Sequence, residues 1–166
     1  METGPLLVCY DGSDGAKEAL AAAAHAFPGR EAVVVSYWQP FGSTKRLGID
    51  IRELVQDPDA INLREAALAE SLAEEGAALA RDAGLDAQPQ AVRIDGPIDE
   101  AILSQSDELE AAAIVLGSRS RSSLRSLLLG STANEIAQRS PRPVFLVPSH
   151  GLAERRRDEL AREQPS

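Results

Sequence analysis

Short apolar runs alternate along the chain with longer stretches in which apolar residues recur every three or four positions. The runs cover residues 6–10, 32–38, 112–116 and 144–147, and residues 87–94 indicate a weaker, more polar strand. Continuous apolar runs of this length are typical of strands that are buried on both faces of a sheet. Strands that alternate with helices favour a parallel arrangement. The pattern therefore predicts an α/β domain, with helices covering both faces of a five-stranded parallel sheet.

The stretches between the runs predict four helices. Ser13 is a suitable N-cap for the first helix, and Pro28-Gly29 ends it. Its apolar stripe is Ala16, Leu20, Ala23 and Phe27. A third helix follows Asp95-Gly96-Pro97, with Ile98 and Ile102 on its buried side, and a fourth covers Ala133–Arg139.

The second helix has a start signal of its own. Asn62 and Glu65 have the spacing of a capping box, and Gly84 is a natural stop. The predicted apolar face is Leu68, Leu72, Gly76, Leu79 and Ala83. Residues 41–61, which precede this helix, show no periodicity and predict a long loop. In the third strand, Pro89 indicates an edge position.

A loop of small residues separates the fourth strand from the fourth helix. It runs from Gly117 to Thr132, and between Gly117 and Asn134 it carries Arg119, Arg121 and Arg125 but no acid. Small residues allow the backbone to come close to a ligand, and the N–H groups at a helix start point towards an anion. A surface loop that is simply rich in Ser and Arg is the competing interpretation.

Composition narrows the choice of partners and compartment. The 166 residues carry a net charge of −9 and have a pI near 4.7, which argues against nucleic acid or an anionic membrane surface as a partner. Cys9 is the single cysteine, so no internal disulfide or cysteine metal cluster can form. The first residues lack the features of a signal peptide, and no run is long enough to span a membrane. These features predict a cytoplasmic protein.

Three landmarks resemble those of the universal stress protein family. One landmark is similar to that family's nucleotide-binding signature. It consists of Gly117, two residues, Ser120, nine residues and then Gly130-Ser131. The first strand runs into Asp11-Gly12-Ser13, and Ser140-Pro141-Arg142-Pro143 precedes the last strand. The resemblance covers residues 5–148 and leaves 149–166 as a charged tail, either a solvated helix or frayed. One position departs from the signature, because Ser120 stands where the family has a glycine.

The resemblance implies strand order 3-2-1-4-5, the adenine nucleotide α-hydrolase-like fold. It also implies that ATP binds where the ends of the first and fourth strands meet. The nucleotide-binding residues it indicates are Cys9, Asp11, Tyr37, Leu116, Gly117, Arg119, Ser120, Gly130, Ser131 and Thr132. Asp11 would accept a hydrogen bond from a ribose hydroxyl or hold Mg²⁺. The family also pairs its last strand across a two-fold axis, which implies a homodimer.

Several of these residues have a purely structural interpretation as well. Asp11 is also a common Asx-turn or helix-capping residue. Cys9 serves equally well as a small buried apolar side chain. Tyr37 and Trp38 could pack under the long loop instead of flanking a base. Arg119 and Arg121 suit phosphate, but they could equally be solvated loop charges.

The chain lacks the sequence patterns of several catalytic classes. No Gly-Lys-Ser/Thr follows a glycine loop, there is no Gly-x-Ser-x-Gly elbow, and neither His25 nor His150 is placed as a general base. We therefore expect a binder or switch in the stress response with at most slow hydrolysis. An adenylating enzyme of the same superfamily is a weaker alternative, because Asp11-Gly12-Ser13-Asp14 does not match its Ser-Gly-Gly-x-Asp-Ser loop. A dimer that binds no nucleotide is the other alternative, and Ser120 supports it.

Overall fold

Five parallel strands form one sheet in the order β3-β2-β1-β4-β5. The structure is a computed structural model that describes residues 4–41, 57–118 and 131–163. The strands are β1 (Leu6–Cys9), β2 (Glu31–Trp38), β3 (Asp86–Arg93), β4 (Ala113–Gly117) and β5 (Val144–Val147). The predicted fold class and strand order are confirmed, and β3 lies at one edge, as Pro89 suggested.

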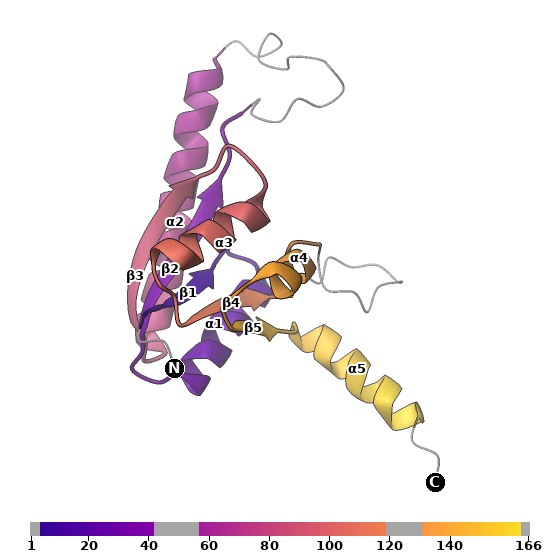
Figure 1. Cartoon of the computed structure of the whole chain (residues 1–166). Coiled ribbons are helices and arrows are strands. Elements are labelled where there is room, and N and C mark those ends of the chain that lie inside the picture. Colours follow the sequence, from indigo (N-terminus) through magenta and orange to yellow (C-terminus); the bar gives the residue numbers. More distant parts are fainter. Residues whose placement is uncertain (1–3, 42–56, 119–130, 164–166) are drawn as a thin grey trace, which may run out of the picture.

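Helices cover both faces of this sheet (Figure 1). They are α1 (Asp14–Ala26), α2 (Pro58–Asp82), α3 (Ile98–Glu108) and α4 (Ser131–Arg139), and a further helix, α5 (His150–Glu163), follows β5. Residues of α1 and α2 pack on one face of the sheet, and residues of α3 and α4 pack on the other. The part of the chain that the structure describes contains no helix that is both long and apolar enough to cross a membrane.

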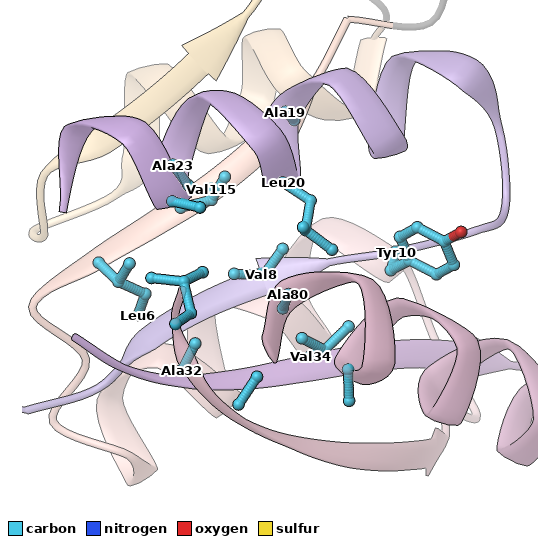
Figure 2. Packing of buried hydrophobic residues seen from close by; sticks show 14 of the residues in the cluster. Leu6, Val8, Tyr10, Ala19, Leu20, Ala23, Ala32, Val34, Ala80 and Val115 are labelled. Carbon is cyan, nitrogen blue, oxygen red and sulfur yellow. The ribbon is translucent and has the colours of Figure 1, made fainter. Parts of the chain in front are cut away.

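The side chains of β1 alternate between the two cores. Leu6 and Val8, together with Tyr10 directly after the strand, belong to the core under α1 and α2, whereas Leu7 belongs to the core under α3 and α4. Figure 2 shows Leu20 of α1 and Ala80 of α2 near Val8, and Ala23 of α1 near Val115. Burial of a Leu or Val side chain stabilises the fold by about 1.5–3 kcal/mol. The central strand thus joins the two layers.

Helix α2 begins earlier than its sequence pattern indicated. Asp57 is the N-cap, its Oδ1 accepts from the Ala60 N–H at 2.9 Å, and Pro58 lies in the first turn. The predicted capping box at Asn62 is therefore wrong, and the last residues of the predicted 41–61 loop are helical. Asn62 instead accepts a hydrogen bond of 2.6 Å from the Phe41 N–H. Residues 42–56 of that predicted loop lie outside the described residues.

The buried face of α2 differs from the prediction in part: Gly76 is buried and Leu72 packs against the core, as predicted, but Leu68 and Leu79 do not belong to that face. The buried residues are Ala69, Ala73, Gly76, Ala77 and Ala80. By contrast Leu68 is 55% and Leu79 37% exposed. The cause is the close approach of α2 to the sheet: a Cβ on Gly76 would lie 2.8 Å from atoms of Tyr10 and Val34. Small side chains fit this contact and leucines do not.

The tail contains a helix. Figure 1 shows α5 extending away from the rest of the molecule. At its start, the His150 N–H donates to the Glu18 carboxylate of α1 at 2.7 Å, and the Ser149 N–H donates to Ser118 Oγ at 2.9 Å. Of the two forms expected for residues 149–166, the helix is therefore the one found over residues 150–163.

Candidate functional site

A cleft of about 270 Å³ lies at the carboxyl ends of the central strands. The strand order reverses between β1 and β4, and open α/β sheets bind their ligands at such a point. The cleft is lined by Cys9, Tyr10, Asp11, Ser13, Ala16, Ser36, Tyr37, Leu72, Ile98, Ile102, Leu116, Gly117, Thr132 and Ala133. Six of the ten residues indicated by the sequence are thus brought together: Cys9, Asp11, Tyr37, Leu116, Gly117 and Thr132.

The turn from β1 into α1 is held by Asp11. Its Oδ1 accepts hydrogen bonds from the Ser13 N–H at 3.1 Å and the Ser13 hydroxyl at 2.5 Å. Ser13 in turn caps α1 by accepting from the Ala16 N–H at 3.2 Å, as predicted. Gly12 adopts φ 74°, a left-handed conformation that favours glycine. Asp11 thus has a structural role in this turn, while its exposed carboxylate also lines the cleft.

Cys9 lies at the end of β1, beside Tyr37. Burial, reinforced by the negative charge of Asp11, raises the pKa of its thiol to about 12. The thiolate is the reactive form of cysteine, so a neutral thiol is a poor nucleophile at physiological pH. Cys9 therefore contributes a small, nearly apolar surface to the floor of the cleft.

Tyr10 links the cleft to helices α1 and α2. Its hydroxyl donates to Glu75 Oε1 on α2 at 2.7 Å, and the same oxygen lies 3.3 Å from Lys17 Nζ on α1. The hydrogen bond from Tyr10, with that from Lys17, holds the pKa of Glu75 below its usual range. The Tyr10 carbonyl accepts from the buried Ser36 hydroxyl at 2.6 Å, which ties β1 to β2. This network fixes the strand ends that form the cleft.

Tyr37 contributes to the cleft from the end of β2. It packs against the core under α3, and its hydroxyl has no hydrogen-bond partner among the described residues. Burial raises the pKa of this hydroxyl far above its ordinary value. A buried hydroxyl without a partner costs about 1–3 kcal/mol.

Gly117 brings β4 against the start of α1. A Cβ at this position would collide with the carbonyl oxygen of Gly15, and a Cβ on Gly15 would lie 2.9 Å from the Ser118 carbonyl oxygen. Both glycines therefore permit a backbone contact between β4 and α1. This contact places the Asp11 turn beside the end of β4.

The start of α4 forms the opposite end of the cleft. Helix α4 begins at Ser131, and Thr132 and Ala133 line the cleft. The first N–H groups of a helix lack partners within the helix and attract anions. Arg119, Ser120 and Gly130 lie outside the described residues. The cleft can thus receive a ligand with an anionic end at α4 and an apolar end near Tyr37.

Some lining residues were not assigned to the site from the sequence. Tyr10 and Ser36 are polar residues in buried strand positions, a signal that could have indicated them. Leu72 and Ile98 were predicted as apolar positions of their helices, but their contact with the cleft depends on tertiary packing. Among the described residues, Asp11 is not part of any cluster of three or more His, Cys, Asp or Glu side chains suited to a metal ion.

Comparison with known proteins identifies the class to which this fold and cleft belong. The model of the universal stress protein family matches residues 3–148, so the chain belongs to that family. No curated protein matches the chain.

Three solved structures illustrate the similarity. A universal stress protein from Archaeoglobus fulgidus is 25% identical with a TM-score of 0.65, covering 87% of this chain and 98% of that one. A universal stress protein from the same organism in complex with dAMP is 20% identical with a TM-score of 0.58, covering 89% and 99%. An Arabidopsis thaliana family member with AMP bound is 13% identical with a TM-score of 0.57, covering 98% and 97%.

Proposed function

We propose that this protein is an adenine-nucleotide-binding universal stress protein whose ligand is ATP, acting as a binder or switch in the stress response. The observation that carries the proposal is the cleft at the strand-order reversal, between the Asp11 turn and the start of α4. Solved structures of universal stress proteins in complex with dAMP, cAMP and AMP support the class of ligand.

In the proposed complex the phosphates lie towards α4 and the base lies towards Tyr37. The helix start offers N–H donors and the Thr132 hydroxyl to an anion. Arg119, Ser120, Gly130 and Ser131, which the family signature indicates, would extend this phosphate site. Cys9, Leu116 and the backbone of Tyr37 supply mostly apolar surface with nearby polar groups, which suits a purine.

Binding is favoured over catalysis by the chemistry of the lining. Among the described lining residues Asp11 is the one carboxylate, and the Cys9 thiol is held neutral by a pKa of about 12. A neutral thiol is not an activated nucleophile, and no histidine is among the described lining residues. We therefore propose at most slow hydrolysis, and a cytoplasmic protein, in keeping with its single cysteine.

Asp11 is the residue through which the proposal is best tested. If its charge holds Mg²⁺ or a ribose hydroxyl, Asp11→Asn removes that contact but keeps an oxygen that can accept from Ser13. A hydrogen bond to a charged group contributes about 1.5–3 kcal/mol, so the affinity for ATP should fall at least about tenfold. Calorimetric titration of both proteins with ATP, with Mg²⁺ and with EDTA, measures this effect.

The outcomes separate the two roles of Asp11. If the loss of ATP affinity in Asp11→Asn disappears in EDTA, Asp11 acts through the metal. If the loss persists in EDTA, Asp11 acts through the ribose hydroxyl. Unchanged affinity together with a lower melting temperature would restrict Asp11 to the turn. If the unmodified protein binds no adenine nucleotide, the nucleotide-free dimer becomes the better description.

We extend the proposal to a homodimer that pairs through β5. This strand forms one edge of the sheet, and its four residues are apolar and half-buried. Exposed edges with apolar side chains tend to pair or to be covered.

A further inference from the structure

A second hollow, called the outer hollow below, adjoins the cleft. It has a volume of about 380 Å³ and lies over the ends of β2 and β3, between α2 and α3. Tyr37, Leu72 and Ile98 line both spaces, so they form a shared wall. The outer hollow therefore continues the cleft on the side away from the start of α4.

Hydrogen bonds fix the rim of the outer hollow. The Ile94 N–H donates to the Trp38 carbonyl at 2.9 Å and joins the ends of β3 and β2. Gln39 Nε2 donates to the Gly96 carbonyl at 2.7 Å, in the turn before α3. These contacts fix the ends of β2 and β3, which form part of the described lining, and the turn before α3.

Most of the described residues that line the outer hollow are apolar or aromatic. Leu68 contributes a side chain that is 55% exposed, and Trp38 and Ile94 add apolar surface. Glu65 is the one charged residue among its described lining residues, and it is negative. A second phosphate or another anion is therefore disfavoured, whereas an uncharged apolar group would bury apolar side-chain surface.

We infer that the site takes an adenine nucleotide carrying an apolar, preferably aromatic, group on its base. This inference rests on the proposed function, in which the phosphates lie at α4 and the base lies beside Tyr37. A group attached to the edge of the base that faces away from the phosphates would reach beyond Tyr37, Leu72 and Ile98 into the outer hollow. Trp38 offers an aromatic surface there, and aromatic pairs add to the gain from burial alone.

The experiment compares ATP with N6-benzyl-ATP on the full chain by calorimetry. Partial burial of the benzyl ring should make N6-benzyl-ATP bind roughly three- to tenfold more tightly than ATP. Trp38 is the single tryptophan of the chain, so its fluorescence reports on the outer hollow directly. Its emission should change more with N6-benzyl-ATP than with ATP.

A matched pair of variants tests where the ring lies. Leu68→Glu places a charge in the outer hollow. The preference for N6-benzyl-ATP, which is the ratio of the affinities for N6-benzyl-ATP and ATP, should then fall to about one. Leu79→Glu makes the same change on the same helix, at a position that is 37% exposed and lines neither space, and should keep the preference. A preference that survives Leu68→Glu would overturn the assignment of the ring to this hollow.

The two proposals fail in different ways. If ATP binds and N6-benzyl-ATP binds equally or more weakly, the inference about the outer hollow is wrong and the proposed function stands. If neither compound binds, the proposed function is wrong and this inference falls with it.

Discussion

Gly117 ends β4 beside the first turn of α1, and its contacts give it a role that its place in a motif does not reveal. The family signature assigns this glycine to a nucleotide. In the structure a Cβ would meet the backbone of Gly15, which no change of side-chain rotamer can relieve. The glycine is therefore required by helix–strand packing, whether or not a nucleotide also contacts it.

We predict that Gly117→Ala destabilises the fold by about 1–3 kcal/mol, the usual cost of overpacking. Urea unfolding followed by circular dichroism measures this change. Gly151→Ala is the control, because a Cβ there meets no atom within 4 Å and the position lies in α5. Its stability should be unchanged or slightly higher. Lost ATP binding in Gly117→Ala without lost stability would instead give this glycine a role in the ligand site alone.

Single residues also mark the limit of what the sequence could predict about the cleft. The pattern predicted that Asp11 and Gly117 end strands, whereas their meeting at the reversal of strand order was implied by the family resemblance. The links from Tyr10 to Glu75 and from Ser36 to the Tyr10 carbonyl join residues 65 and 26 positions apart, and no local pattern encodes them. The unpartnered hydroxyl of Tyr37 depends on three-dimensional packing in the same way.

At the scale of elements, α2 shows why helix existence is easier to predict than helix orientation. Its existence and amphipathic character were predicted, but hydrophobicity favoured the leucines as the buried face. The spacing between a helix and a sheet decides whether leucine or alanine fits, and that spacing is set by the partner strands. Here Gly76 and its neighbouring alanines allow close packing on Tyr10 and Val34.

The orientation of α2 leads to a paired prediction. Ala77→Leu should cost about 1–3 kcal/mol or more, because Ala77 is 0% exposed and a larger side chain must displace its neighbours. Leu79→Ala should change stability by less than about 0.5–1 kcal/mol, since Leu79 is 37% exposed. Denaturant unfolding of both variants provides the measurement. If Leu79→Ala lowers the free energy of unfolding more than Ala77→Leu does, the buried face is instead the leucine face that the sequence pattern favoured.

For the whole molecule, the sequence predicted the architecture but not the shape of its ligand space. Apolar runs alternating with helical stripes were enough for a parallel sheet with helices on both faces. The strand order came from the resemblance and is confirmed by the pairing of β1 with both β2 and β4. The outer hollow could not be predicted, because it depends on how the first turns of α2 lie over the ends of β2 and β3.

The two edges of the sheet differ in a way that bears on assembly. The β3 edge carries Gln88, Pro89 and Gln90, and polar residues and proline discourage edge pairing. The β5 edge consists of four apolar residues. If the protein is a homodimer, β5 is therefore the edge at which the two copies would meet.

We predict that light scattering gives the mass of two chains at micromolar concentration, and that Phe145→Lys shifts the protein towards the monomer. Phe145 also packs edge-on against Phe27, with ring centroids 5.5 Å apart, so this variant disturbs the core as well. Phe145→Leu is the control, because it removes the ring pair but keeps an apolar side chain at the edge. Dimer loss in the lysine variant alone would locate the interface at β5, because only that variant places a charge there. Equal loss in both variants would point to core packing, and a monomer for the unmodified chain would contradict the homodimer.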